Sequence, residues 1–178
     1  MGAESGARLQ SGFGVQIRRA EPRDAEALVA LGRDVGAEPE GWLITTGGWR
    51  TAGEERRYLK AIRRWEHGAV FVAEADGRVV GRLSVARDQH PASRHVADLG
   101  LMVAADQRGR GIGRTLLVAA VDWAREAGVT KLELHVFPWN EPAIRLYERF
   151  GFEREGVRRG HYRREGEEVD AILMAYRL

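Results

Sequence analysis

The chain has 178 residues, of which 44% are hydrophobic and 30% are charged, and its formal net charge is +2. These values lie near the averages of soluble globular proteins, so they exclude a disordered, collagen-like or coiled-coil chain. No apolar run approaches the roughly 18 residues of a membrane span, and the length fits one domain with its own core.

Cysteine is absent, which excludes disulfides, thiolate metal sites and a cysteine nucleophile. All but two of the 28 basic residues are arginine, a side chain suited to phosphate and carboxylate, although a codon bias explains this equally well. Residues 1–12 lack the pattern of a secretory signal, so we expect a flexible N-terminal tail, a domain over residues 13–178 and a cytoplasmic location. The small net charge does not indicate a nucleic-acid partner.

The first half of the chain predicts helices and a hairpin. Pro22 after Glu21 is typical of a helix start, and Asp76-Gly77 between two apolar runs is a strong hairpin signal. The predicted elements are a strand over 15–19, a helix starting near Pro22, a loop over 36–53, a helix over 54–65, and strands over 69–75 and 78–87.

The second half predicts alternating strands and helices. The predicted elements are a strand over 95–103, a glycine turn over 108–113, a helix over 112–127, a strand over 131–137, a helix from Asn140 to Gly151 and a final hairpin over 153–178. A strand, a helix and a strand joined by short connections imply a right-handed crossover and a parallel pair. The fold class is therefore α/β (α+β), with one mixed sheet.

The glycine turn Arg108-Gly109-Arg110-Gly111-Ile112-Gly113 precedes the clearest helix. Glycines at a helix start present backbone N–H groups to an anion, so the turn suits a phosphate, although a plain tight turn is equally compatible. The turn is not a dinucleotide fingerprint, because the third glycine of that pattern would fall on Arg114. It is not a Walker A loop either, because no lysine follows.

A second segment, Asn140-x-x-Ala143-x-x-Leu146-Tyr147-x-x-x-Gly151-Phe152, follows the turn after one helix and one strand. Together with Arg108-x-x-Gly111-x-Gly113, it resembles the GNAT acetyltransferase superfamily, from about Ile17 to the C-terminus. The resemblance implies a single domain with a mixed, mostly antiparallel sheet, about four flanking helices and a splay between the fourth and fifth strands. It also implies acetyl-CoA as the co-substrate and no metal.

The resemblance implies a cofactor site along the turn and the strand before it. The backbone from Gly109 to Arg114 would receive the pyrophosphate, and the main chain near Met102 and Val103 would lie along the pantetheine. Asn140 matches the asparagine that contacts the cofactor, and it fits a helix N-cap equally well. The expected cofactor-binding residues are Met102, Val103, Arg108, Gly109, Arg110, Gly111, Ile112, Gly113, Arg114 and Asn140.

The implied chemistry needs a general acid and a general base. Tyr147 matches the tyrosine that protonates the departing thiolate, and its alternative is a core aromatic residue. His135 is the first choice of base, because it lies where similar ribosomal-protein acetylases carry a strand glutamate, and its alternative is a packed histidine. Asp98 is the second choice and Glu133 the third, the latter being equally compatible with a solvated strand residue.

The expected function is direct transfer of an acetyl group to a primary amine of a small molecule or amino acid. A protein N-terminal acetyltransferase, a non-catalytic acyl-CoA-binding module and, more weakly, a nucleic-acid binder are the alternatives. Trp42 and Trp49 are candidates to line the acceptor pocket, with plain packing favoured for at least one. The final hairpin carries Arg158, Arg159, Arg163 and Arg164, which fit a solvated face better than a site for an acidic acceptor. No membrane partner is expected, and a homodimer is a weak expectation.

Overall fold

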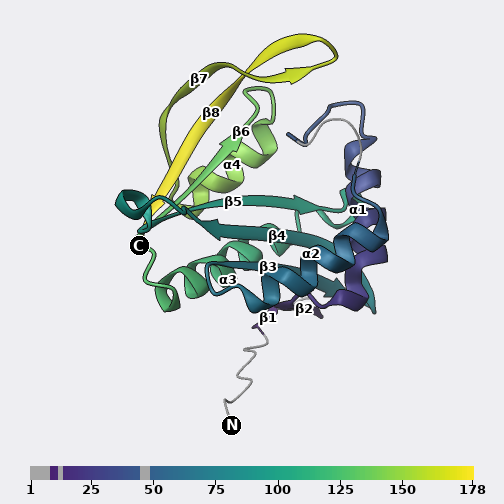
Figure 1. Ribbon diagram of the computed structural model, residues 1–178. Helices are drawn as coiled ribbons and strands as arrows, with labels where there is room; N and C mark the ends of the chain where they lie inside the picture. Colours follow the sequence, from purple (N-terminus) through teal and green to yellow (C-terminus); the bar gives the residue numbers. More distant parts are fainter. Residues whose placement is uncertain (1–8, 12–13, 45–48) are drawn as a thin grey trace.

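The computed structural model describes residues 9–11, 14–44 and 49–178, which form an eight-stranded sheet with helices on both faces (Figure 1). The strands lie in the order β1-β2-β3-β4-β5-β6-β8-β7. Their bounds are β1 Leu9–Ser11, β2 Val15–Arg19, β3 Gly68–Ala75, β4 Arg78–Arg87, β5 Val96–Val103, β6 Lys131–Val136, β7 Glu153–Arg164 and β8 Glu167–Arg177. The helices are α1 Ala25–Gly36, α2 Ala52–Arg64, α3 Ile112–Glu126 and α4 Glu141–Phe150. Single 3-10 turns span Pro22–Asp24, Pro91–Ser93 and Ala105–Gln107.

Local sequence accounts for most of these boundaries. At the β3–β4 turn, Asp76 and Gly77 both have positive φ, at 50° and 73°, as a two-residue hairpin turn requires. Helix α2 begins two residues earlier than predicted, because Thr51 and Glu54 form a reciprocal capping box. The side chain of Asn140 caps α4 by accepting a hydrogen bond from Ala143 N at 3.2 Å, so its predicted N-cap role is confirmed.

The N-terminal part differs from the expected flexible tail at three residues. Leu9–Ser11 form β1, which pairs antiparallel with β2 in the register Leu9↔Ile17. Backbone pairing with an edge strand gives this short segment a fixed place that its composition does not indicate. Residues 1–8 and 12 of the expected tail lie outside the described residues.

The helices divide between the two faces of the sheet. Apolar side chains of α3 and α4 pack with those of β2–β6 and β8 in the largest cluster, whereas α1 and α2 form a second cluster with β3. Strand β3 is buried along almost its whole length because both clusters cover it. No helix in the described ranges is long and apolar enough to cross a membrane.

The predicted splay lies between β5 and β6. These strands run parallel but pair at only three positions, the last being Asp98↔Glu133, and beyond that position they separate. Strand β5 stays paired with β4 as far as Val103, and β6 stays paired with β8 as far as Val136. From Leu99 to Val103, the main-chain groups of β5 that point away from β4 therefore have no ladder partner in β6. The mixed sheet and its splay are confirmed.

Candidate active site

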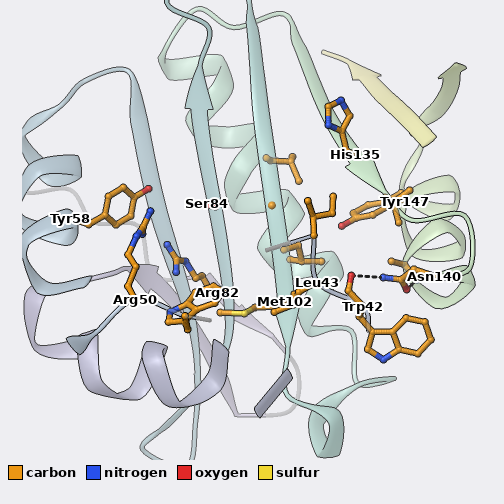
Figure 2. A pocket seen from close by; sticks show the side chains of 17 residues that line it. Trp42, Leu43, Arg50, Tyr58, Arg82, Ser84, Met102, His135, Asn140 and Tyr147 are labelled. Atoms are coloured by element: carbon orange, nitrogen blue, oxygen red, sulfur yellow. Dashed lines mark hydrogen bonds between the residues drawn. The ribbon is translucent and has the colours of Figure 1, made fainter. Parts of the chain in front are cut away.

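A cavity of about 320 Å³ lies at this splay (Figure 2). Its floor is the stretch of β5 that has lost its β6 partner, together with Arg82 and Ser84 of β4. The described residues that line it are Trp42, Leu43, Ile44, Trp49, Arg50, Tyr58, Arg82, Ser84, Leu99, Gly100, Leu101, Met102, His135, Val136, Asn140, Ala143 and Tyr147. Segments from both halves of the chain therefore enclose one space.

The glycine turn forms an open cradle at the start of α3. Gly109 and Gly111 have φ of 74° and 80°, and a Cβ built at either glycine would meet nothing within 4 Å. The first N–H groups of a helix have no intrahelical partner and carry the positive end of the dipole. The turn thus has the chemistry of an anion site, with room for a phosphate against the backbone. Gly113 differs, since its Cβ would lie 2.8 Å from Leu146 Cδ2 of α4.

The three arginines of the turn do not converge on it. Arg108 makes a two-point ion pair with Glu38 at 2.6 and 2.7 Å, and its Nε donates to the carbonyl of Val103 at 3.1 Å. Arg110 donates to Gln107 at 2.7 Å, and the guanidinium of Arg114 lies 5.7 Å from the centre of the Phe150 ring. The side chain of Arg108 is thus engaged with the end of α1, which the sequence did not indicate. Any anion site here rests mainly on backbone groups.

Asn140 and Met102 both line the cavity. Besides capping α4, Asn140 donates through Nδ2 to the Trp42 carbonyl at 3.5 Å, as Figure 2 shows. Met102 is buried against α1, whereas Val103 packs on the opposite face of the sheet. In β5, Met102 pairs with Arg82 of β4, and the Val103 carbonyl accepts from Arg108 Nε, so the main chain of neither residue is fully unpartnered.

Tyr147 projects from α4 into the cavity with only 5% of its surface exposed. Its ring packs 5.6 Å from the Phe152 ring, so it is also the core aromatic residue considered as its alternative role. Burial, together with the negative charge of Asp98, raises the pKa of Tyr147 well above its usual value. The phenol therefore stays protonated throughout the physiological pH range.

His135 lines the cavity from β6. Its Nδ1 lies 2.7 Å from the hydroxyl of Tyr162 in β7, and its Nε2 is buried with no hydrogen-bond partner among the described residues. Burial and the positive charges of Arg158 and His161 lower the pKa of His135. A neutral imidazole with one buried, unpartnered nitrogen therefore forms part of the cavity wall.

Asp98 and Glu133 lie beside the cavity and do not line it. They are the last Cα partners of the β5–β6 ladder, and Asp98 remains accessible to solvent at this position. Surrounding protein and the charge of Glu133 raise the pKa of Asp98 to about 6. Glu133 pairs with Lys131 at 3.2 Å. The structure thus brings His135 and Tyr147 together in the cavity and leaves both carboxylates outside it.

Several residues of the site had no signal in the sequence. Arg82 and Glu55 form a buried pair, and Tyr162 reaches His135 only through the register of the final hairpin. Trp42 and Trp49 both line the cavity, and Trp49 also covers Gly32 of α1. Of the hairpin arginines, Arg164 is not solvated as expected. It donates to the Gly41 carbonyl at 2.9 Å and holds the α1–α2 connection.

Comparisons with known proteins agree with this geometry. Residues 40–152 match the model of the acetyltransferase (GNAT) family. The chain is 35% identical to the L-amino acid N-acetyltransferase AaaT of Escherichia coli over 90% of this chain and 96% of that one. A ribosomal-protein-alanine N-acetyltransferase from Brucella melitensis is similar in structure, with a TM-score of 0.79 and 31% identity over 91% of this chain and 99% of that one. A Salmonella typhimurium protein solved with acetyl-CoA shares the fold, with a TM-score of 0.81 at 22% identity over 92% and 94% of the two chains.

Proposed function

Because the chain belongs to the GNAT acetyltransferase family, we propose that its cavity catalyses transfer of the acetyl group of acetyl-CoA to a primary amine of a small molecule or an amino acid, with release of free CoA. Family membership makes the protein an acetyl-CoA-dependent N-acetyltransferase, so the proposal concerns the acceptor and the residues that act. The observation that carries it is the position of the cavity at the β5–β6 splay, with His135 and Tyr147 in its lining. Acetyl-CoA supplies the activated acetyl group.

The cofactor residues divide into a cradle and an edge. The backbone N–H groups from Gly109 to Arg114 bind the pyrophosphate, since the positive φ of Gly109 and Gly111 leaves the cradle open. The main chain near Met102 and Val103, where β5 has no β6 partner, holds the extended arm and orients the thioester carbonyl. Asn140 positions the start of α4, while Arg108 braces the turn against Glu38.

His135 acts as the base that takes a proton from the incoming ammonium group. For Nε2 to accept, the neutral ring carries its hydrogen on Nδ1 and donates it to the Tyr162 hydroxyl, which fixes both the tautomer and the ring orientation. The lowered pKa keeps the imidazole neutral near pH 7. Asp98 is the second candidate, and its charge favours an ammonium group approaching the splay.

Tyr147 serves the leaving group. Its hydroxyl donates a hydrogen bond to the departing sulfur, which is the role of a general acid. Because burial raises the pKa of the phenol above that of an ordinary thiol, strong hydrogen-bond donation fits better than complete transfer of the proton.

A protein N-terminus is the second candidate acceptor. The 31% identity to a ribosomal-protein-alanine N-acetyltransferase favours it. His135 in place of a strand glutamate argues against that specific substrate. A cytoplasmic location and a homodimer stay predictions from the sequence.

The test is an acceptor panel with acetyl-CoA, in which free CoA is measured and each product is identified by mass. The panel holds amino acids, small amines, polyamines and peptides with free N-termini. We expect N-acetylated amino acids or small amines. If only peptides were acetylated, the acceptor would be a protein N-terminus instead of a small molecule or amino acid. If no compound of the panel gave acceptor-dependent CoA release, the proposed function would be refuted.

A further inference from the structure

The end of the cavity away from His135 and Tyr147 carries more positive than negative charge. Arg82 reaches it from β4 with a side chain only 8% exposed, and Arg50 reaches it from the loop before α2. Both guanidinium groups pair with the fully buried Glu55, at 3.2 Å from Arg82 Nη1 to Oε1 and 3.1 Å from Arg50 Nη1 to Oε2. Two cations thus share one carboxylate, and no Asp or Glu is among the described lining residues.

The hydrogen-bond donors at this end of the cavity also outnumber the acceptors. A guanidinium offers five N–H donors, and Glu55 supplies only two oxygens for two such groups. The 3.2 Å approach of Arg82 does not form a hydrogen bond with Oε1, and the indole N–H of Trp49 nearby is buried with no described partner. Burial lowers the pKa of Arg82 while Glu55 opposes that shift, and a guanidinium stays charged near neutral pH. Glu55 Oε1 has no hydrogen-bond partner among the described residues either, but the N–H donors at this end still outnumber the two carboxylate oxygens.

Aromatic rings hold the two cations in place. The guanidinium of Arg50 lies 4.3 Å from the ring centre of Tyr58, and that of Arg82 lies 5.3 Å from the ring centre of Trp49. Such contacts restrict the long side chains before any ligand arrives, so little ordering is left to occur on binding. The donors are preorganised for a planar, bidentate partner such as a carboxylate.

The cationic end lies beside the strand that floors the splay. Arg82 is the Cα partner of Met102, and Ser84 is the partner of Gly100. Figure 2 shows Arg50, Tyr58 and Arg82 on one side of the cavity and His135, Asn140 and Tyr147 on the other. A molecule whose amine faces His135 can therefore direct a neighbouring group toward Arg82 within the same space.

We propose that Arg82 and Arg50 bind the carboxylate of the acceptor, which makes the substrate an α-amino acid with a free carboxylate and an uncharged side chain. This inference rests on the proposed function. The apolar lining, including Trp42, Leu43 and Met102, accommodates the side chain, and the described lining offers no acid to a cationic one. Glu55 then has a positioning role, since it holds both guanidinium groups in the cavity.

The first test compares acceptors that differ only at the carboxylate. L-Phenylalanine, L-methionine and L-glutamine are each assayed beside their amides and their decarboxylated amines. We expect kcat/KM for the free amino acids to exceed that for both analogues by about 10-fold or more, as for loss of a charged hydrogen bond. Equal or faster turnover of amides or amines would overturn the carboxylate site and leave the proposed function intact. If no acceptor of any class gave acceptor-dependent CoA release, the proposed function itself would be refuted.

The second test uses variants with a matched control. Arg50→Ala, and the double variant Arg82→Met/Glu55→Gln that leaves no unpaired buried charge, should raise KM for the amino acids about 10-fold or more and leave kcat/KM for the decarboxylated amines unchanged. Arg57→Ala removes an exposed arginine of α2, the helix that carries Glu55, and should change neither. Circular dichroism and acetyl-CoA affinity verify the fold. Equal losses for amino acids and amines would assign the arginines a structural role and refute the inference.

Discussion

The pKa values of His135 and Asp98 shift in opposite directions although the two residues lie in nearly the same part of the molecule. Both lie near the point where β5 and β6 separate. Burial and neighbouring positive charges lower the pKa of His135, whereas desolvation by the surrounding protein and the charge of Glu133 raise that of the solvent-accessible Asp98 to about 6. At pH 7 the imidazole is therefore neutral and the carboxylate is mostly ionised, so both can accept a proton, and variants are needed to tell which group causes an acid-side loss of activity.

The pH dependence of kcat/KM should identify the base. A protonated imidazole cannot accept a proton, so activity should fall on the acid side with an apparent pKa below the ordinary histidine value of about 6.5. His135→Ala should lower kcat about 100-fold or more and abolish this limb, while Asp98→Asn should keep it. If the limb persists in His135→Ala and disappears in Asp98→Asn, the base is Asp98.

Tyr147→Phe should separate catalysis from packing. The ring stays in the core, so the thermal midpoint and acetyl-CoA affinity should change little, whereas loss of the donor to the departing sulfur should lower kcat about 100-fold. Tyr176→Phe is the matched control. Tyr176 lies on β8, packs against Phe152 and is not among the described cavity residues. A kcat within threefold of wild type would leave Tyr147 as a packing residue only.

At the level of elements, the glycines of the turn are not equivalent. Gly109 and Gly111 use positive φ and leave open space above the start of α3, whereas Gly113 permits close approach of α4 through Leu146. The alternating pattern in the sequence presents the three as one motif. Only the packing of α3 against α4 shows that Gly113 serves helix contact, whereas Gly109 and Gly111 leave room for the cofactor.

Gly111→Ala tests the cradle, and Gly128→Ala is its control. Both glycines have positive φ, at 80° and 69°, and both have open space around a new Cβ, but Gly128 lies past the other end of α3. Each change should cost about 1 kcal/mol of unfolding free energy in urea titration. Only Gly111→Ala should weaken acetyl-CoA binding, by about 10-fold or more in calorimetry, because its methyl group enters the anion cradle. Equal acetyl-CoA affinity in both variants would refute the assignment of the turn.

The elements themselves were largely predictable because their signals are local. The Asp76-Gly77 turn, the apolar stripe of α3 and the strand–helix–strand order of β5, α3 and β6 each lie within one short stretch of chain. The missed features needed information from elsewhere. Strand β1 exists through its pairing with β2, and Tyr162 meets His135 through a hairpin with irregular register.

Across the whole molecule, the two halves of the site differ in how far the sequence could predict them. The proposed cofactor half lies within residues 96–152, so motifs and spacing indicated it. The acceptor end combines α2, β4 and the α1–α2 connection, where the Arg82–Glu55 pair has no local signature. In the sequence, Arg50 and Arg82 also look like ordinary surface residues, because arginine is mostly exposed in proteins.

Long-range contacts close the two halves over one cavity. The α1–α2 connection is tied to the glycine turn by Glu38 and Arg108, to the β6–α4 connection by a hydrogen bond of 3.1 Å from Trp139 Nε1 to the Glu40 carbonyl, and to the final hairpin by Arg164. These ties fix the roof of the acceptor end relative to the cofactor turn. The acceptor end and the β5–β6 splay therefore open onto the same cavity.

This arrangement predicts a ternary complex with direct transfer. The whole chain lacks cysteine to carry an acetyl group, and the proposed base and acid, His135 and Tyr147, line the same cavity, so the amine can attack the thioester without an acyl-enzyme stage. Initial-velocity plots against both substrates should intersect, and intact mass after incubation with acetyl-CoA alone should show no added acetyl group. Parallel lines together with a stable acetyl adduct would contradict direct transfer, because the chain would then have to hold the acetyl group before the amine arrives.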